Sequence, residues 1–520
     1  MKKGISVLLA LILCLGCFTG CVGSIPTGDA LLMEGEDPAE ETIAPDSQDL
    51  TLAYYPDRSM NPLYGSDYTN RVVMSLMYQG LFAVDSKNNT TPILCSQYQV
   101  TPDNRTWTIY LEPNATFSDG TRVTVQDVVA SYEQARQNEY YKGRFTHIAR
   151  VELSSDGGVD FFLDTPYQNL ALLLDIPIVK ASEVTVDNPL GTGPYSLEDG
   201  IGGKHLQRVV GWWCSSDDLV AKDSSIALVE AESPSQIRDE FEFSGLSVVC
   251  TNPQTDSYAD YRCDFELWEV DSGFMMYIGC NVTYSKFFDD GTLRTFLTYG
   301  IDRQTLVDDN YGGLALPTTL PISPMSPYYS KSLAANYDYD EMRFIDAASK
   351  FRVPTNDKGV PRTLQLLVNS DDSARLRCAR NIAATLTELG LACETVESPT
   401  SVYEARLQAA NYDIYLGITK LPTTADLSEF YRPWGEMSWG GLANETIYNM
   451  VNQSLADRGN YYNLHKLVAD DGRIIPVMAG YYAIYAKRGV LSDLNPARDN
   501  VFYYTLGKTM ESSKVATQFS

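Results

Sequence analysis

The sequence has few of the residues on which most enzyme signatures depend. It contains three histidines, His147, His205 and His465, and no two lie within one helical turn of each other. The zinc-binding HExxH pattern, the GxSxG nucleophile motif and the P-loop are absent, and CxxC occurs only in the N-terminal apolar run. We therefore expect no catalytic residue, no metal and no cofactor. Paired cleft carboxylates leave no signature in a sequence, so a secreted carboxylate hydrolase stays open as an alternative.

Positive charge is also scarce. The chain of 520 residues has 40 Lys and Arg against 67 Asp and Glu, a formal net charge of −27. No basic patch interrupts this acidity, and an acidic surface repels a phosphate backbone, so nucleic acid is excluded as a partner. After residue 20 no run approaches 18 apolar residues, and we expect no membrane-spanning helix.

The N-terminus has the layout of a secretory signal. Lys2 and Lys3 precede an apolar run over residues 5–16, and small residues then lead to Phe18-Thr19-Gly20-Cys21. This ending resembles a bacterial lipobox, which predicts a signal peptide over 1–20 and a lipid anchor on Cys21. Cys17 is a second candidate, and an ordinary cysteine beside a cleavage site is the alternative. Two acyl chains anchor a protein stably, so we expect an extracytoplasmic protein held to the membrane by lipid alone.

A tether and a folded body follow the anchor. Residues 21–47 contain no Lys or Arg and many acidic residues, which predicts a flexible, self-repelling segment. The body contains seven cysteines, an odd number without framework spacing, so buried thiols are expected rather than a disulfide framework. Only Cys250 and Cys263 are close in sequence.

Helical and strand patterns alternate along the body. Strands are expected at 51–55, 107–111, 364–368 and 412–417, and helices at 71–80, 125–135, 289–299 and 374–389. Thr124 is the expected cap of the second helix, with Asp127 in its first turn. The alternation predicts an α/β fold, while the many Tyr-rich strand patterns argue against a single doubly wound sheet.

Four stretches, in this order, resemble one known family. They are Asn61-Pro62-Leu63 with Tyr78-Gln79-Gly80-Leu81-Phe82, Thr106–Leu111 with Phe117-Ser118-Asp119-Gly120-Thr121, Pro189–Tyr195 (PLGTGPY), and Cys280-Asn281 with Tyr299-Gly300-Ile301-Asp302-Arg303. Together they resemble the extracellular solute-binding proteins, family 5, which serve ABC importers of oligopeptides, dipeptides and nickel. Each motif also has a structural reading, because Asp119-Gly120 suits a turn and Gly191 to Pro194 sets backbone angles.

The resemblance implies a two-lobed, type II periplasmic-binding-protein-like clamp of three domains. Residues 48–87, 190–270 and 475–510 would form the first lobe, 88–189 an inserted second domain, 271–474 the second lobe, and 511–520 a tail. It also implies a monomer that takes a small solute, with an oligopeptide favoured, and delivers it to ABC permease subunits. The alternatives are the carboxylate hydrolase and a degenerate surface lipoprotein with an adhesion or signalling role.

The ligand site is expected near residues 417–439. Peptide-binding members of the family pair the peptide ammonium with an Asp in a Trp-containing stretch, and our alignment places Ile418 at the Trp and Leu421 at the Asp. Asp426 is the candidate substitute for this carboxylate, and a change of ligand to an uncharged or anionic solute is the competing interpretation. The candidate aromatic residues of the cleft, each with core packing as the alternative, are Tyr64, Tyr68, Tyr431, Trp434 and Trp439.

Overall fold

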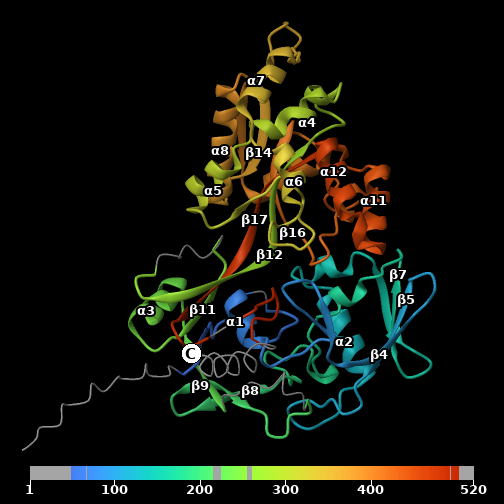
Figure 1. Ribbon diagram of the computed structural model, residues 1–520, viewed down its shortest axis with the longest axis vertical. Coiled ribbons are helices and arrows are strands. Elements are labelled where there is room, and N and C mark those ends of the chain that lie inside the picture. The colour runs from blue at the N-terminus through green and yellow to red at the C-terminus, as the bar shows by residue number, and fades with distance from the viewer. Residues whose placement is uncertain (1–48, 66, 215–223, 254–260, 492–493, 503–520) are drawn as a thin grey trace, which may run out of the picture. The chain divides into compact units, whose positions relative to one another are not determined.

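A computed structural model describes residues 49–502 except 66, 215–223, 254–260 and 492–493 (Figure 1). The predicted signal peptide, the Cys21 anchor, the tether over 21–47 and the tail over 511–520 lie outside the described residues. The described residues all fall within one unit of the chain. Within them, no helix combines the length and the apolar character that crossing a membrane requires.

One mixed sheet of eleven strands organises most of the molecule. Its strands follow the order β15-β14-β16-β12-β17-β11-β1-β10-β9-β8, and β13 pairs with β17 outside this path. Their bounds are β1 (Thr51–Tyr54), β8 (Tyr195–Gly200), β9 (Gly203–Arg208), β10 (Ser225–Glu230), β11 (Val248–Thr251), β12 (Phe265–Cys280), β13 (Leu316–Pro317), β14 (Leu364–Asn369), β15 (Cys393–Ser398), β16 (Ile414–Lys420) and β17 (Ile474–Lys487). Parallel pairs (β1 with β10, β14 with β15) and antiparallel pairs coexist, as expected for a fold that is not doubly wound.

Two long antiparallel strands, β12 and β17, run through the middle of this sheet (Figure 1). All but the last residue of β17 are buried, because the strand is covered on both faces. β12 is irregular between Asp271 and Met275, where the register shifts and Gly273 adopts φ +77. A Cβ at Gly273 would also lie 2.4 Å from the carbonyl oxygen of Leu421, so this position requires glycine.

A separate four-stranded sheet has the order β4-β5-β7-β6. Its strands are β4 (Cys95–Val100), β5 (Thr106–Leu111), β6 (Ile148–Leu153) and β7 (Val159–Leu163), and a small hairpin, β2 (Phe82–Val84) with β3 (Thr90–Pro92), precedes it. Helix α2 (Val125–Ala135) begins where it was predicted: the Asp127 carboxylate accepts hydrogen bonds from the Thr124 N–H (2.8 Å) and hydroxyl (2.7 Å). The sheet falls within the predicted inserted domain, 88–189, although the domain boundaries themselves stay a prediction.

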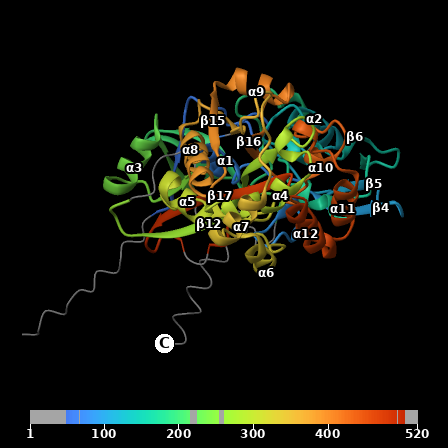
Figure 2. The same cartoon turned by 90° about the horizontal axis from the view of Figure 1, so that it is seen from above.

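The remaining helices cover the sheets. They are α1 (Tyr68–Met74), α3 (Pro234–Phe243), α4 (Thr292–Phe296), α5 (Arg303–Tyr311), α6 (Lys331–Ala334), α7 (Glu341–Lys350), α8 (Ser373–Glu388), α9 (Thr400–Gln408), α10 (Ser428–Tyr431), α11 (Glu445–Ala456) and α12 (Tyr461–Asp471). The 3-10 helices are η1 (Lys142–Phe145), η2 (Leu170–Leu173), η3 (Ala181–Glu183), η5 (Lys286–Phe288), η6 (Leu297–Gly300), η7 (Ala335–Tyr337), η8 (Trp439–Gly441) and η9 (Arg458–Asn460). Helix α8 packs on β14 and β15, with α5 beside it (Figures 1 and 2).

Three local expectations differ from the structure. The helix expected over 289–299 is broken, because Gly291 adopts φ +71 and α4 begins only at Thr292. The helix expected over 71–80 is α1, which begins at Tyr68 with Asp67 as its cap and ends at Met74. Gly191 and Gly193 are required by close packing rather than by backbone angles, since a Cβ would lie 2.1 Å from the Met77 oxygen at Gly191 and 2.5 Å from the Met77 carbonyl carbon at Gly193.

The expectation of buried thiols holds for four of the seven body cysteines, whereas Cys214, Cys263 and Cys393 are only half-buried. Cys95, Cys250, Cys280 and Cys378 are buried and unbridged, and Cys250 is not joined to Cys263. Burial raises the pKa of the Cys95 thiol and of the Cys378 thiol to about 12, so both stay protonated and unreactive at neutral pH.

Candidate functional site

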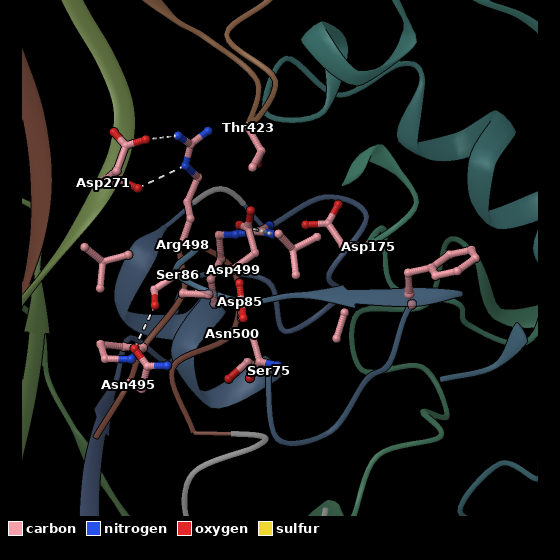
Figure 3. Close-up of a pocket in the computed structure, with 18 of the residues that line it drawn as sticks. Ser75, Asp85, Ser86, Asp175, Asp271, Thr423, Asn495, Arg498, Asp499 and Asn500 are labelled. Carbon is pink, nitrogen blue, oxygen red and sulfur yellow. Dashed lines mark hydrogen bonds and ion pairs between the residues drawn. The ribbon is translucent and has the colours of Figure 1, made fainter. Parts of the chain in front are cut away.

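A cavity of about 400 Å³ opens beside α1, the β2–β3 hairpin, β12 and the chain that follows β17 (Figure 3). This volume lies within the range of about 300–1,000 Å³ that small-molecule sites occupy. Its walls combine apolar side chains, among them Met74, Phe82 and Trp268, with charged groups. Most lining residues come from the segments predicted as the first lobe. Asn88, Ile93, Asp175 and Pro177 come from the predicted inserted domain, and Asp271, Met325 and Thr423 come from the segment predicted as the second lobe.

The charged part of the cavity is built on Asp499. Arg144 Nη2 lies 2.7 Å from one carboxylate oxygen, Arg71 Nη2 lies 3.4 Å from the other, and the Tyr140 hydroxyl donates to the same carboxylate. Arg144 also makes two hydrogen bonds to Asp175, of 2.9 and 3.0 Å. Burial alone would raise the pKa of Asp499, but Arg144 and Arg71 hold it well below its usual range. Asp499 is therefore ionised at any physiological pH.

Arg498, the preceding residue, points the opposite way. Its guanidinium donates to the Asp271 carbonyl (3.0 Å) and carboxylate (2.6 Å), as Figure 3 shows. It also donates to the Leu421 carbonyl at 2.8 Å. The segment after β17 thus connects α1 and η1, through Asp499, with β12 and the chain after β16. The alignment placed Leu421 at the amine-binding position. In the structure the Leu421 carbonyl accepts a hydrogen bond from the Arg498 guanidinium, so a cationic group of the protein itself already occupies it.

Lys420, the last residue of β16, borders this network. Its Nζ donates to the Tyr482 hydroxyl at 3.0 Å and lies 3.7 Å from the centre of the Tyr140 ring, over which the Arg71 guanidinium also lies at 3.6 Å. Among the described residues, no carboxylate lies within 4.0 Å of Lys420 Nζ. Burial, together with Arg498, Arg71 and Arg144, lowers the pKa of Lys420 well below its usual range, against the opposing effect of Asp499. By its accessible surface, however, Lys420 is an exposed residue, and it does not line the cavity.

Two lining side chains have hydrogen-bonding atoms without a partner. Gln79 is only 4% exposed, and neither the nitrogen nor the oxygen of its side-chain amide is hydrogen-bonded. The Arg71 Nε–H is likewise buried and unpaired. Buried polar groups are nearly always satisfied in native proteins, so unpaired atoms on a cavity wall indicate where a ligand or water would bind.

The predicted carboxylate, Asp426, lies elsewhere. Its Oδ2 is 3.2 Å from His147 Nε2, and its Oδ1 accepts from the Ser428 N–H at 2.8 Å. His147 Nδ1 lies 2.9 Å from Asp164. Although burial lowers the pKa of His147, Asp426 and Asp164 raise it to about 10, and His147 lowers the pKa of Asp426 in turn. Asp426 is neutralised within the protein and does not line the cavity.

The five predicted aromatic residues are not brought together in the cavity. Tyr68 is buried and stacks on Tyr482, with ring centres 3.6 Å apart, next to the charged network. Tyr64 is 43% exposed, Tyr431 is buried in the core, and Trp439 packs partly against the same core. Trp434 is 98% exposed and adopts φ +62. Ligand contact by any of them stays a prediction, and none of the five lines the cavity.

The cavity residues that the sequence did not single out are Arg71, Gln79, Arg498 and Asp499. Arg71 and Asp499 are 428 positions apart, and no local pattern connects them. Lys420 belongs to the stretch 417–439, where the ligand site was expected. The sequence feature that could have drawn attention to it is a lysine at the end of an apolar strand. Gln79 belongs to the motif Tyr78-Gln79-Gly80-Leu81-Phe82. Nothing in that motif indicates that the Gln79 side-chain amide would be left without a hydrogen bond.

The solved structures that this chain resembles include two described as peptide-binding proteins and one complex with Ni(L-His). The unliganded open form of MppA, a periplasmic murein tripeptide-binding protein, matches with a TM-score of 0.72 at 15% identity, over 88% of this chain and 97% of that chain. AppA from Clostridium difficile, a putative peptide-binding protein, matches with a TM-score of 0.69 at 15% identity, over 88% and 99%. NikZ from Campylobacter jejuni, solved with Ni(L-His), matches with a TM-score of 0.61 at 16% identity, over 88% and 98%. These matches confirm the predicted α/β fold of the two-lobed, type II clamp.

Curated relatives include the glutathione-binding protein GsiB of Salmonella typhi, which is 25% identical over 302 residues. That match covers 54% of this chain and 57% of the relative, so the chain spans little more than half of it. GsiB of Escherichia coli O6:K15:H31 is 25% identical over 318 residues, 57% of this chain and 60% of the relative.

The family model of bacterial extracellular solute-binding proteins, family 5, matches residues 89–441, which is more than half of the chain. The match confirms the resemblance that the sequence motifs indicated. It also confirms the expectation of a binding protein rather than an enzyme, because the family is defined by solute binding. The chain belongs to family 5 of the bacterial extracellular solute-binding proteins.

Proposed function

We propose that this protein is the substrate-binding component of an ABC importer and that it captures a peptide-like solute in the cavity beside α1 and β12. The unpaired amide of Gln79 carries the proposal, because a side-chain amide offers one donor group and one acceptor, the same pair that a peptide group offers. The cavity volume and the mixture of apolar and charged walls suit a small organic solute. Relatives and structural neighbours described as glutathione-binding and murein tripeptide-binding support the same class of ligand.

Native mass spectrometry of freshly purified protein tests this proposal directly. We expect a co-purified mass of peptide size that is lost on partial denaturation and dialysis. The stripped protein should then gain stability from the same compound by RT ln(1 + [L]/Kd), about 2.7 kcal/mol at a hundredfold excess over Kd. If the clamp closes on its ligand, small-angle scattering should show a smaller radius of gyration. Turnover of the compound would instead indicate a hydrolase, and tight binding without compaction would contradict the clamp.

We also propose that the protein is a lipoprotein anchored through Cys21, so that the body can meet permease subunits at the membrane. The proposal rests on the sequence Phe18-Thr19-Gly20-Cys21 and on the acidic segment that follows it. Cys21→Ser should release the processed protein from the membrane fraction, because it removes the site of acylation. Cys17→Ser is the matched control and should leave the protein in the membrane fraction. Retention of a processed Cys21→Ser protein would contradict the anchor.

A further inference from the structure

A short stretch of chain, residues 421–428, joins two parts of the molecule that have separate sheets. It follows β16 of the eleven-stranded sheet and belongs to the segment predicted as the second lobe, 271–474. Opposite it lies the segment predicted as the inserted domain, 88–189, which carries the four-stranded sheet. A Cβ at Gly143 would lie 3.5 Å from Pro422 Cδ, so the two segments pack closely there. We call this contact the seam.

His147 makes a buried polar contact across the seam. It directly precedes β6, and its Nε2 lies 3.2 Å from the Asp426 carboxylate and 2.9 Å from the Ser428 hydroxyl, both on the opposite side. Its Nδ1 lies 2.9 Å from Asp164, which belongs to its own side. The side chains of His147 and Asp426 are 1% and 4% exposed, whereas that of Asp164 is 51% exposed. Separation of the two segments would take Asp426 away from His147 and leave Asp164 beside it.

The geometry around His147 requires a proton on each ring nitrogen. A carboxylate only accepts hydrogen bonds, and each nitrogen faces one, so both nitrogens must donate. A neutral imidazole has one N–H and would turn a lone pair towards one of the two carboxylates. The Ser428 hydroxyl can donate to Nε2 instead, but the buried Asp426 carboxylate is then left without its cation. Although burial lowers the pKa of His147, Asp426 and Asp164 raise it to about 10.

The other titratable groups near this pair are two tyrosines and an arginine. The ring centre of Tyr167 lies 5.9 Å from that of His147, and Tyr461 and Arg458 lie close enough to Tyr167 to interact with it electrostatically. Burial, followed by Asp426, raises the pKa of both tyrosines above the ordinary value of 10.0, so both stay protonated below pH 10. Arg458 keeps its charge throughout. Among these groups, His147 is therefore the one that loses its charge as the pH rises from neutral.

We infer that closure of the clamp is coupled to protonation of His147, which forms a latch between the inserted domain and the second lobe. With its proton, His147 bridges Asp164 on its own side and Asp426 on the other, and this favours the closed arrangement. Without it, the Asp426 carboxylate is buried with no cation, and the open arrangement, in which water solvates that carboxylate, is favoured instead.

The direction of the pH dependence follows from the number of carboxylates beside the imidazole. The open arrangement leaves His147 with Asp164 alone, so it binds the proton less tightly than the closed arrangement does. Closure is therefore fully favoured below about pH 6.5 and weakens as the pH rises towards 10. This inference goes beyond the proposed function, because it concerns the motion of the clamp and does not depend on which solute is bound.

Small-angle scattering of the ligand-free protein tests the coupling, because the radius of gyration reports the proportion of open and closed clamp. Protein stripped by partial denaturation and dialysis is measured at pH 6, 8 and 9.5 as wild type, His147→Gln, Asp426→Asn and the control His205→Gln, which changes a histidine on β9. Circular dichroism at each pH shows whether the protein is folded. NMR spectra of histidine-labelled protein give the protonation state of His147, since the chain has three histidines and the two histidine variants assign the signals.

The radius of gyration of wild type and of His205→Gln should increase from pH 6 to pH 9.5 without a change in circular dichroism. The ratio of closed to open protein should fall at least about tenfold, the effect of one unit of pKa difference between the two arrangements. His147→Gln should have the larger radius at every pH, because glutamine offers Asp426 no cation. Asp426→Asn should respond less to pH, because a neutral amide holds the proton on the imidazole less strongly than a carboxylate does.

A folded His147→Gln protein with the wild-type radius at pH 6 would overturn the latch. A neutral His147 at pH 6, or a wild-type radius that stays constant while His147 loses its proton, would overturn it as well. If His147→Gln does not fold, Asp426→Asn decides: a radius that increases with pH as much as that of the wild type would contradict the coupling. Each of these outcomes would leave the proposed solute binding intact, because no solute is present in the experiment.

Discussion

Two ionic clusters of this protein differ in their position relative to the cavity. In the first, His147 lies between Asp164 and Asp426, and its second nitrogen also faces the Ser428 hydroxyl at 2.9 Å. In the second, around Asp499, the arginines are paired but Lys420 has no carboxylate within reach. We call the first cluster closed, because its single imidazolium lies between two carboxylates and none of these three groups lines the cavity, whereas the second is open, because the unpaired Arg71 Nε–H belongs to a residue that lines the cavity.

The difference separates a structural charge from one available to a ligand. Asp426 was predicted to bind an amine because it is a carboxylate in the right stretch of sequence. In the structure, the imidazole of His147 occupies that role, so the carboxylate is buried and neutralised. Lys420, six residues earlier, is an exposed residue that has no carboxylate within 4.0 Å of its Nζ among the described residues and does not line the cavity. Type and position of a charged residue therefore say less about binding than the list of its partners does.

The largest effect should come from breaking the open cluster at its centre. Asp499→Asn removes the carboxylate that compensates Arg71, Arg144 and Lys420, so we expect a loss of about 3–5 kcal/mol in the free energy of unfolding. Denaturant unfolding followed by circular dichroism measures this loss. Asp346→Asn, at an exposed pair with Lys350, is the matched control and should cost less than about 1 kcal/mol. Equal losses in the two variants would mean that the Asp499 network contributes nothing beyond a surface pair.

The closed cluster should show itself in the pH dependence of stability. Because the pKa of His147 is raised from 6.5 to about 10 in the folded protein, the stabilisation it provides is complete below pH 6.5 and is lost as the pH rises towards 10. Asp426→Asn should lower the free energy of unfolding at pH 6 by about 1–3 kcal/mol and should flatten the decline between pH 7 and 10.

Denaturant unfolding at pH 6, 8 and 10 gives both quantities from one series. The control is His205→Gln, which changes a histidine on β9 and should keep the wild-type slope. A slope in Asp426→Asn as steep as that of the wild type would show that the pairing does not hold the proton on His147.

The smallest effect should come from the exposed aromatic loop. Trp434 is almost fully exposed, in a left-handed conformation that side chains resist, so Trp434→Gly should raise the free energy of unfolding by about 1 kcal/mol. Because Trp434 does not line the cavity, the affinity for the compound that co-purifies with the protein should change less than about twofold. A tenfold loss of affinity would show that the loop reaches the ligand and would restore the stacking role that the sequence suggested.

The sequence predicted the features that depend on neighbours along the chain. The Thr124 cap of α2, the turn at Asp119-Gly120 and the end of α8 before Gly390 are of this kind, since capping and left-handed turns require particular residues at fixed offsets. The two-lobed fold was predicted from the resemblance to family 5, because these local features do not determine it. Its motifs include positions where close packing leaves no space for a larger residue, such as Gly191 against Met77.

The site could not be predicted in the same way, because its chemistry is set by partners that are distant in sequence. Nothing near Asp426 indicates that His147 will pair with it, and nothing near Arg71 indicates Asp499. The burial of Gln79 without a partner depends on the packing of several segments at once. The residue types in the sequence limit which classes of ligand are possible. Which hydrogen-bond donors and acceptors remain unpaired in the site is decided by the folded structure.

The first strand and helix contact parts of the chain that are made much later, so the order of synthesis limits when these contacts can form. β1 hydrogen-bonds to β10 and β11, β11 pairs with β17, and Arg71 receives its carboxylate from Asp499, 428 residues later. Translation adds about 5–20 residues per second, so roughly 20–90 seconds pass between the synthesis of Arg71 and that of Asp499. Strands β1, β10 and β11 can pair once residue 251 has been made, but β17 must follow before β11 gains its second neighbour. A nascent chain interrupted before residue 474 therefore lacks the strand that joins β11 to β12.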